Sequence, residues 1–388
     1  MGQFVEKGKR GRDIAVDSQL EPASGNPGRT GSNLPRMGTR AWITARLVTL
    51  ARVYFTWLFA WAILQFFGDR WWWLFLGNTF AVYLFVPLPA VLAIAFLVRR
   101  RETWIGFALA LALGAYLYGG LFLPKGLVRT AFSRAHADAP TLTVMSYNML
   151  GFNEHPEEVV AAIRAADADV VAMQELNPAV AEAIQRELGE VYPYRALDPQ
   201  QGVTGSGVIS RYPLYPSGEM LPGEWVGTPQ VLTLDWEGKR VTLLNFHTMP
   251  TTLGSRDLRA IAATIEGSVR ERERQAQAIV DWVGAHPGPI IALTDFNAGD
   301  RSDAYALVTD VLVDAWPEAG WGLGHTFPGA ASAGSSRPAV SGVPIVPKWL
   351  VRIDYVFYSE HWRALSARIG PWDGISDHRP VVATLILR

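Results

Sequence analysis

Apolar residues are concentrated in three long runs between residues 41 and 123, and only short polar stretches separate them. The runs extend over about 47–67, 71–98 and 103–123. Each is close to the roughly 20 residues that a helix needs to cross the hydrocarbon core of a bilayer. The pattern therefore predicts three transmembrane helices, the second with length to spare for a tilt or for a kink at Pro87 and Pro89. A cleavable signal peptide is a poorer explanation, because no short apolar core followed by a small-residue cleavage site is evident.

Basic residues give the predicted helices an orientation. Residues 1–46 carry a net charge of +4, and residues 99–101, between the second and third runs, are all arginines. Positive charge favours the cytoplasmic side, so we expect a cytoplasmic N-terminus and a position outside the membrane for everything after residue 123. Residues 1–40, a mixture of Gly, Ser, Pro, Asn and basic residues, are expected to form a disordered tail, and 124–140 a short linker.

From residue 141 to 388 the pattern becomes that of a soluble α/β domain. Short β-rich runs predict strands at 142–148, 168–176, 205–210, 230–236, 240–246, 289–296, 352–359 and 380–387. Amphipathic runs predict helices at 156–166, 178–188 and 257–284. This alternation predicts an α/β fold in which helices cover the faces of β-sheets. The Gly-, Ala- and Ser-rich stretch 329–344 is expected to be a mobile loop that acts as a lid.

Composition narrows the possible functions. Lys and Arg number 35 against 36 Asp and Glu, and the chain after residue 102 carries a net charge of −8. This balance excludes a strongly basic protein that binds polyanions through its overall charge. The charged fraction of 18% is low beside the quarter or so that is usual for soluble proteins, which agrees with membrane helices. The absence of cysteine excludes disulfides, thiolate-bound zinc, iron–sulfur clusters and thiol nucleophiles.

Polar residues at the ends of the predicted strands are the candidates for chemistry. They are Asn148, Glu175, His247, Asp295, Asn297, Asp354, Asp377 and His378. Because an extended backbone repeats every two residues, Asp295 and Asn297 should face one side and Phe296 the other. Oxygen ligands without cysteine suit a hard cation such as Mg²⁺, Mn²⁺ or Ca²⁺, and a His held by a carboxylate can activate water. Taken singly, these residues also have ordinary explanations as turn residues or structural hydrogen-bond partners.

Six short motifs occur in the order that is found in one known superfamily. They are Ser146-Tyr147-Asn148, Gln174-Glu175-Leu176, Asn245-Phe246-His247, Asp295-Phe296-Asn297, Arg352-Ile353-Asp354-Tyr355 and Ser376-Asp377-His378-Arg379-Pro380. Through them residues 141–388 resemble the endonuclease/exonuclease/phosphatase superfamily, in the form of a membrane-anchored bacterial member. The resemblance implies a four-layered α/β/β/α sandwich, preceded here by the three predicted transmembrane helices. Thr294 stands where the superfamily usually has glycine, which leaves the neighbouring polar pair unaltered.

The resemblance also implies a role for each candidate residue. The implied ligands of a divalent cation, Mg²⁺ above all, are Glu175 with help from Asn148 or Asp377. The implied phosphate contacts are Asn148, His247 and Asn297. The implied catalytic residues are His247, Asp295, Asp354 and His378. In this set His247 stabilises the added charge, Asp295 orients the attacking water or binds metal, and Asp354 with His378 supplies the general base.

The expected function is that of a metal-dependent phosphodiesterase, anchored in a bacterial-type plasma membrane, that cleaves phospholipid or sphingolipid headgroups on its outer side. Members of the superfamily cut nucleic acids and lipids with nearly the same residues, so fold and motif do not name the substrate. Three membrane spans would confine the site near a bilayer, and a charge of −8 lacks the basic footprint of a nuclease. An extracytoplasmic nuclease, and a non-catalytic membrane receptor or scaffold that keeps the fold, are the alternatives.

Overall fold

The apolar N-terminal part consists of helices joined by short connections. The computed structural model describes residues 38–123, 139–252, 257–329, 339–340, 343–344 and 346–388. The longer helices here are α1 (Thr39–Leu64), α2 (Trp72–Thr79), α3 (Leu88–Val98) and α4 (Arg101–Tyr118). Three short 3₁₀ helices accompany them: η1 (Gln65–Phe67), η2 (Ala81–Phe85) and η3 (Gly119–Phe122). Nearly all of the predicted tail, most of the predicted linker and most of the predicted lid lie outside the described residues.

Within the described residues, three helical stretches are long and apolar enough to cross a membrane, as the sequence predicts. They are Thr39–Phe67, Ala81–Val98 and Arg101–Phe122. The run expected at 71–98 is not one helix, because its tryptophan-rich start forms the separate helix α2. Within the same run α3 begins directly after Pro87, whose ring nitrogen has no hydrogen to continue the preceding helical ladder.

One cluster of apolar side chains joins these helices. Its buried members are Ala51, Phe55, Leu58, Trp61, Leu74, Ala81, Val91 and Ala110. Gly106 of α4 allows the close approach of α1, because a Cβ at this position would lie 2.3 Å from the ring of Phe55. Large apolar side chains on the outer faces are exposed, among them Trp57, Leu97 and Tyr116. Exposed apolar surface of this kind marks contact with a membrane or with another protein.

Two six-stranded sheets form the C-terminal part, in the orders β13-β14-β1-β2-β4-β3 and β5-β6-β7-β8-β12-β9. The first sheet comprises β1 (Thr141–Asn148), β2 (Val170–Gln174), β3 (Tyr194–Asp198), β4 (Ser206–Ser210), β13 (Trp362–Ile369) and β14 (Val381–Leu387). The second comprises β5 (Leu214–Pro216), β6 (Gln230–Trp236), β7 (Lys239–His247), β8 (Ile290–Asp295), β9 (Val313–Asp314) and β12 (Asp354–Tyr358). The short strands β10 (Ala339–Val340) and β11 (Val343–Pro344) pair separately.

Each sheet has one parallel pair at its centre, and this arrangement positions the site. β1 pairs with β2 in the first sheet, and β7 pairs with β8 in the second. A parallel pair needs a crossover connection, which helices α6 (Pro156–Ala166) and α8 (Leu258–Ala285) provide. The carboxyl ends of both strands in a parallel pair meet at the same sheet edge. His247 therefore lies opposite Asp295 at the end of its pair.

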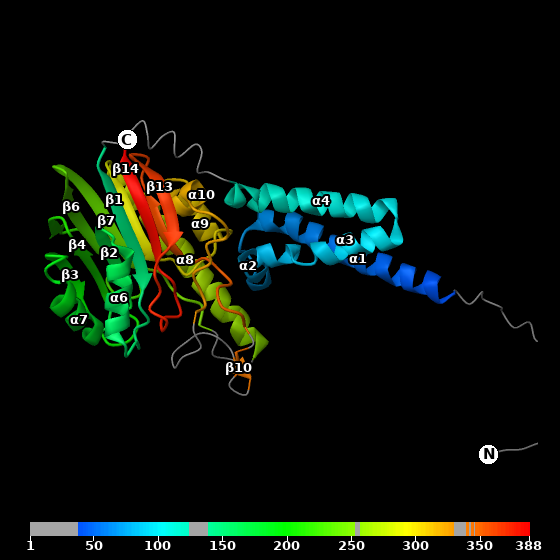
Figure 1. The fold of residues 1–388 in the computed structure, drawn as a ribbon, viewed down its shortest axis with the longest axis horizontal. Helices are drawn as coiled ribbons and strands as arrows, with labels where there is room; N and C mark the ends of the chain where they lie inside the picture. The colour runs from blue at the N-terminus through cyan, green and yellow to red at the C-terminus, as the bar shows by residue number, and fades with distance from the viewer. Residues whose placement is uncertain (1–37, 124–138, 253–256, 330–338, 341–342, 345) are drawn as a thin grey trace, which may run out of the picture. The chain divides into compact units, whose positions relative to one another are not determined.

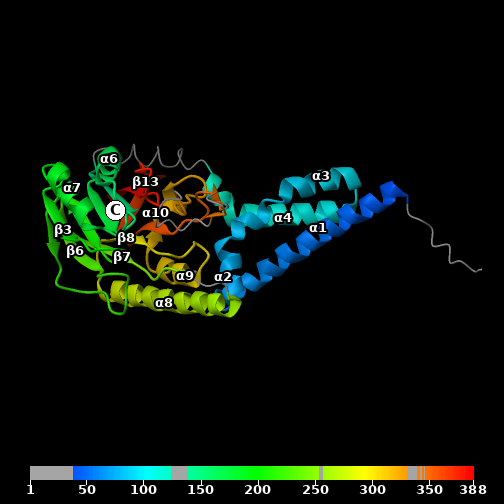
Figure 2. The same cartoon turned by 90° about the horizontal axis from the view of Figure 1, so that it is seen from below.

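Three apolar cores separate four layers. The remaining helices are α7 (Pro178–Leu188), α9 (Asp303–Thr309) and α10 (Ala315–Ala319). Helices α6 and α7 pack on the first sheet, where Ile184 meets Met173 in one core, and α8 and α9 pack on the second sheet in another. The third core, which includes Val144 and Trp236, lies between the sheets. Figures 1 and 2 show the two sheets between α6 and α7 on one side and α8 on the other, which confirms the predicted sandwich.

The core between the sheets predicts a large effect of one substitution. Trp362 is fully buried there, with its ring centroid 5.4 Å from that of Trp236. Trp362→Ala should lower the free energy of unfolding by roughly 3–5 kcal/mol, because it removes apolar contacts and leaves a cavity. Urea denaturation of the full-length protein in detergent measures this change. The matched control is Trp321→Ala, at a residue 69% exposed; equal effects of the two substitutions would contradict the assigned packing.

Candidate active site

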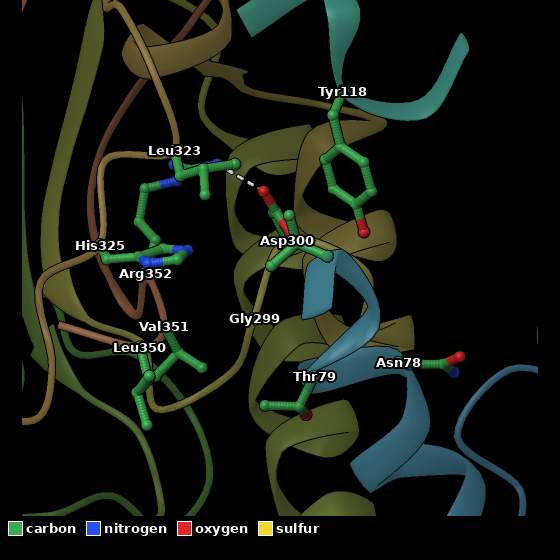
Figure 3. Close-up of a pocket in the computed structure, with 11 residues that line it drawn as sticks. Asn78, Thr79, Tyr118, Gly299, Asp300, Leu323, His325, Leu350, Val351 and Arg352 are labelled. Atoms are coloured by element: carbon green, nitrogen blue, oxygen red, sulfur yellow. Dashed lines mark hydrogen bonds and ion pairs between the residues drawn. The ribbon is translucent and has the colours of Figure 1, made fainter. Parts of the chain in front are cut away.

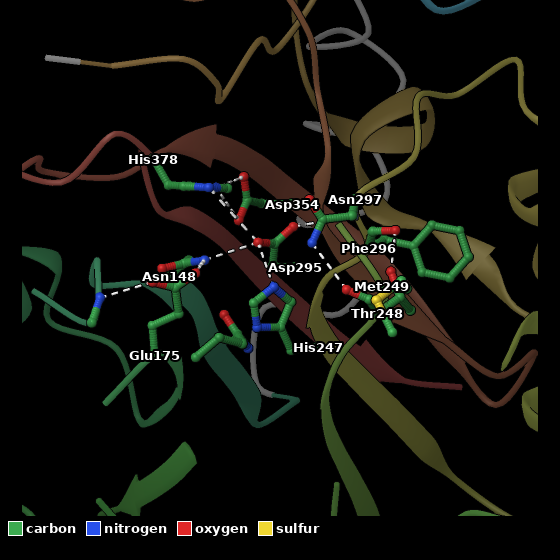
Figure 4. A network of polar contacts seen from close by, with 12 residues as sticks. Asn148, Glu175, His247, Thr248, Met249, Asp295, Phe296, Asn297, Asp354 and His378 are labelled. Atoms are coloured by element: carbon green, nitrogen blue, oxygen red, sulfur yellow. Dashed lines mark hydrogen bonds and ion pairs between the residues drawn. The ribbon is translucent and has the colours of Figure 1, made fainter. Parts of the chain in front are cut away.

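The carboxyl ends of the four central strands bring polar side chains together. Asn148, His247 and Asp295 are the last residues of β1, β7 and β8, and Glu175 directly follows β2. Asn148 links the two sheets here, because its Nδ2 donates to Asp295 Oδ2 at 2.9 Å and to Glu175 Oε1 at 3.0 Å. His247 Nε2 lies 3.3 Å from Asp295 Oδ2. Figure 4 shows these side chains pointing toward one another.

An imidazole–carboxylate pair completes the cluster. Asp354 begins β12 and lies opposite Asp295 in the sheet, while His378 precedes β14. His378 Nδ1 lies 2.9 Å from Asp354 Oδ2 and 3.1 Å from Oδ1, so this nitrogen carries the hydrogen that the carboxylate accepts. His378 Nε2 is 3.7 Å from Asp295 Oδ2. The second nitrogen of His378 therefore faces the same carboxylate that His247 contacts.

Two residues of the cluster have a backbone conformation that side chains rarely adopt. Glu175 has a φ of 57° and Asn297 a φ of 49°, both in the left-handed region. The Glu175 carboxylate is held in place, because Oε2 accepts a hydrogen bond of 2.8 Å from the backbone N–H of Gly151. Gly151 must be glycine, since a Cβ would lie 1.9 Å from the carbonyl oxygen of Gly202. Strained backbone of this kind is common where a fold fixes functional side chains.

Asn297 lies at one side of the cluster. Its backbone N–H donates to Asp295 Oδ1 at 3.1 Å, and its side-chain Nδ2 donates to the carbonyl oxygen of Thr248 at 3.1 Å. Phe296, between the two polar residues, packs in the core under α8 instead, 6.5 Å from the ring of Phe246. Its hydrogen bond to Thr248 fixes the side chain of Asn297 next to His247, which precedes Thr248 in the chain.

Burial and neighbouring charges together determine which members of the cluster are charged. Burial opposes protonation of His378, but Asp354 and Asp295 outweigh it and raise the pKa of His378 well above its ordinary value. Burial also opposes protonation of His247, yet Asp295 and Glu175 raise its pKa. Burial disfavours the charge on Asp295, but the two imidazoles outweigh it and lower the pKa of Asp295 to about 2. Asp295 is therefore an ionised carboxylate between two imidazoles that favour the protonated state.

The side chains offer ligand atoms for a cation in two groups. Atoms of Glu175, His247 and Asp295 lie within 4.8 Å of one another, and so do atoms of Asp295, Asp354 and His378. Carboxylate oxygens are the ligands that Mg²⁺, Mn²⁺ and Ca²⁺ prefer, and an imidazole is compatible with Mn²⁺. The donor set is consistent with a divalent cation, and the two carboxylates of Glu175 and Asp295 are the strongest part of it.

The other two implied ligands are placed differently. Asn148 directs its Nδ2 toward both carboxylates, while its Oδ1 accepts a hydrogen bond of 3.0 Å from the backbone N–H of Leu150. Asn148 thus acts on Glu175 and Asp295 as a donor. Asp377 is buried next to His378, but in the described part of the chain it belongs to neither group of ligand atoms. Its role as a ligand stays a prediction.

The sequence reasoning missed the residues that hold the loop before His378. Asp373 accepts hydrogen bonds of 2.9 Å from the backbone N–H groups of Ile375 and Ser376. It also accepts one of 2.9 Å from Asn153 Nδ2. Ser376 Oγ in turn accepts the backbone N–H of His378 at 3.0 Å. The Asp-Gly dipeptide that begins this loop is a common turn signal and could have marked it.

A separate cavity does not contain the cluster. It is lined by Asp300, His325 and Arg352 among others, together with Asn78 and Tyr118. Figure 3 shows Arg352 directed toward Asp300, and their nearest side-chain atoms are 3.3 Å apart. None of the eight residues predicted to form the site lines this cavity. The candidate chemistry therefore belongs to the cluster of Figure 4.

Two mixed sheets, helices on their outer faces and a buried acid–imidazole cluster at one edge define a class of phosphoesterase-like α/β sandwiches. The sequence model of the Endonuclease/Exonuclease/phosphatase family matches residues 145–378, and the chain belongs to this family. The motifs quoted from the sequence lie within or next to the matched residues. A comparison with curated proteins finds no match.

Several solved structures are similar to this chain. An endonuclease/exonuclease/phosphatase protein from Beutenbergia cavernae is 21% identical, with 64% of this chain and 72% of that chain covered and a TM-score of 0.42. Sphingomyelinase C from Streptomyces griseocarneus is 19% identical, with 63% and 99% covered and a TM-score of 0.42. The human Nocturnin catalytic domain is 18% identical, with 64% and 96% covered and a TM-score of 0.45.

The loop before His378 leads to a testable expectation. Asp373→Ala should lower the rate of phosphodiester hydrolysis about tenfold, because leaving buried N–H groups without an acceptor costs about 1–3 kcal/mol and releases the loop. Hydrolysis of bis(p-nitrophenyl) phosphate by the full-length protein in detergent with Mg²⁺ measures the effect. Asp235→Ala, at an exposed position on β6, is the matched control. If both variants kept the wild-type rate, Asp373 would have no part in positioning His378.

Proposed function

We propose that this protein is a membrane-anchored, metal-dependent phosphodiesterase that cleaves phospholipid or sphingolipid headgroups on the outer side of a cell membrane. The observation that carries the proposal is the meeting of Glu175, His247 and Asp295 within 4.8 Å of one another. The His378–Asp354 pair beside them supplies a group that can exchange protons. Membership of the Endonuclease/Exonuclease/phosphatase family supports the hydrolysis of phosphate esters as the reaction class.

The carboxylates of Glu175 and Asp295 are proposed to hold the cation, with Mg²⁺ as the first choice and Mn²⁺ or Ca²⁺ as others. When bound, the cation polarises a phosphoryl oxygen and neutralises the charge that builds up during attack. Asn148 bridges the two carboxylates through hydrogen bonds of 3.0 and 2.9 Å and so fixes their separation. Asp377 is kept in the proposal as a further ligand.

His247 and Asn297, with Asn148, are proposed to bind the substrate phosphate. His247 contacts Asp295 through Nε2, and its buried Nδ1 has no hydrogen-bond partner among the described residues. A protonated imidazole carries a donor on each nitrogen, so Nδ1 can donate to a phosphate oxygen. Desolvated donors that already point at the reacting group stabilise charge more strongly than donors in water do.

Asp354 and His378 are proposed to move the proton of the attacking water. Asp354 fixes Nδ1 of His378, and this leaves Nε2 as the nitrogen that faces the cluster. Asp295 Oδ2 accepts a hydrogen bond from Asn148 and lies 3.3 Å from His247 Nε2, so this carboxylate is already engaged by two neighbours. Asp295 is therefore assigned to orienting water and holding the cation, while the His378–Asp354 pair exchanges the proton.

Lipid is preferred to nucleic acid as the substrate for two reasons. Three helices long and apolar enough to cross a membrane belong to the same chain as the cluster. The chain after residue 102 carries a net charge of −8, which opposes binding of a long polyanion. An extracytoplasmic nuclease is the second candidate. A non-catalytic receptor or scaffold is less well supported, because every motif position is occupied by a residue able to act.

One experiment tests both the metal and the substrate. The full-length protein in detergent is titrated with Mg²⁺ by calorimetry and then incubated with sphingomyelin, glycerophospholipids or DNA, with and without a chelator. Glu175→Gln should weaken Mg²⁺ binding roughly 100-fold or more, since losing even an outer partner of a metal ligand costs 10–100-fold. It should also abolish the chelator-sensitive release of headgroups.

The control is Glu182→Gln, which removes the same charge from an exposed position on α7. This variant should bind Mg²⁺ and release headgroups as the wild type does. Chelator-sensitive cleavage of DNA alone would support the nuclease instead. Failure to bind any divalent cation would favour the non-catalytic scaffold.

The orientation in the membrane is tested separately. We propose that the N-terminus lies in the cytoplasm and the sandwich outside the membrane. This orientation is favoured by the basic N-terminal region and by the connection Arg99–Arg101. Protease added to intact cells should cut the sandwich and leave an N-terminal epitope tag protected until the cells are permeabilised. Protection of the sandwich in intact cells, with cleavage only after permeabilisation, would reverse the proposed orientation.

A further inference from the structure

Two cations stacked on two tryptophans lie next to the loop that carries His378. Lys348 Nζ is 4.8 Å from the ring centroid of Trp372, and the guanidinium carbon of Arg379 is 4.2 Å from that of Trp349. The two indoles meet edge to face, with centroids 5.2 Å apart and an interplanar angle of 90°. The four residues therefore form one unit, here called the indole–cation pair.

The indole–cation pair is attached directly to the candidate site. Arg379 follows His378 in the chain, and Trp372 Nε1 donates to the carbonyl oxygen of Ser376 at 2.8 Å. A Cβ built on Gly329 would lie 2.8 Å from both Asp377 Cα and the outer edge of the Trp349 ring. Because Gly329 has no side chain, the indole of Trp349 can approach the backbone of the loop that carries His378. These contacts tie the indole–cation pair to the loop that carries His378.

The charge of the two cations is not neutralised within the described part of the chain. Neither Lys348 nor Arg379 forms an ion pair with a carboxylate there. Arg379 Nη2 donates to the carbonyl oxygen of His325, and Arg379 Nε is a buried donor without a partner. The sequence from 330 to 345 contains no Asp or Glu, so that neighbouring segment has no carboxylate of its own to offer. Lys348 is exposed and Arg379 is partly exposed. A cation with these properties is available to an external anion.

We propose that Lys348 and Arg379 form an anion subsite that receives a negative group of the lipid headgroup other than the scissile phosphate. This inference rests on the proposed function and names its substrate class as phospholipids with anionic headgroups. One face of each indole is already occupied by a cation of the protein, so that face is closed to a quaternary ammonium group such as choline. The same two charges repel such a headgroup, which disfavours sphingomyelin and phosphatidylcholine.

A small anionic headgroup fits the indole–cation pair better than a nucleic acid chain does. Two cations at one rim can bind one extra carboxylate or phosphate through charge-assisted hydrogen bonds. A nucleic acid would need a longer cationic track along successive phosphates. The overall charge of −8 after residue 102 runs against such a track.

Phosphatidylserine and phosphatidylethanolamine provide the test, because their headgroups differ by one carboxylate. The kcat/KM of the full-length protein for headgroup release is measured for each lipid in the same detergent micelles. Wild-type protein should favour phosphatidylserine about tenfold. The double variant Lys348→Gln/Arg379→Gln should abolish this preference, mainly through a higher KM for phosphatidylserine. Lys348→Glu, at an exposed position, should reverse the preference.

The control is Lys239→Gln/Arg240→Gln, which removes two exposed cations at the start of β7, the opposite end of that strand from His247. It should keep the wild-type preference. An unchanged ratio in the Lys348 and Arg379 variants, or no preference in the wild type, overturns the subsite and leaves the proposed function standing. Hydrolysis of neither lipid overturns the subsite, and if sphingomyelin is also left intact the proposed function falls with it. A preference for the 5′-phosphorylated dinucleotide pdTdT over dTdT that depends on Arg379 would assign the subsite to a nucleotide substrate instead.

Discussion

The alignment of the two sheets is the constraint on which the site depends. Asn245 lies inside the sandwich on β7, and its Oδ1 accepts a hydrogen bond of 2.8 Å from Gln174 Nε2 on the other sheet. Its Nδ2 donates to the carbonyl oxygen of Met173 at 3.1 Å. A buried amide that lost these partners would cost free energy, so the sheets have one favoured register. Two residues further along β7, His247 and its strand neighbour Asp295 are thereby brought to the edge where Asn148 and Glu175 lie at the ends of β1 and β2 in the other sheet.

The same alignment explains why four ionisable side chains can be buried close together: His247, Asp295, Asp354 and His378. Asp295 contacts His247, His378 and Asn148, so its charge is compensated from three directions. A carboxylate buried without such partners would take up a proton instead. The strained backbone at Glu175 is offset in a related way, because the Glu175 carboxylate accepts hydrogen bonds from Asn148 Nδ2 and from the backbone N–H of Gly151. The hydrogen bonds of the cluster and the backbone conformation of Glu175 therefore belong together.

The sequence predicts the central elements well because their patterns are local. The helices at 156–166 and 178–188 occur with those bounds, since their apolar faces recur at helical spacing. Strand β13 was missed because polar residues interrupt its apolar pattern, at Arg363, Ser366 and Arg368, and a bulge follows Ala364. Such residues suit an edge strand, which charged side chains protect from further pairing. The candidate residues could be named from strand ends, but their hydrogen-bond directions depend on contacts between segments far apart in sequence.

In the proposed function, net charge and local charge act at different stages of substrate recognition. Charges separated by more than about 8–10 Å are largely screened at physiological ionic strength. The charge of −8 spread over the chain after residue 102 therefore acts mainly on the approach of a long polyanion, which meets many of those charges at once. A headgroup already at the cluster responds to its nearest neighbours instead. An acidic domain can thus discourage nucleic acid as a whole and still select an anionic headgroup through two cations beside His378.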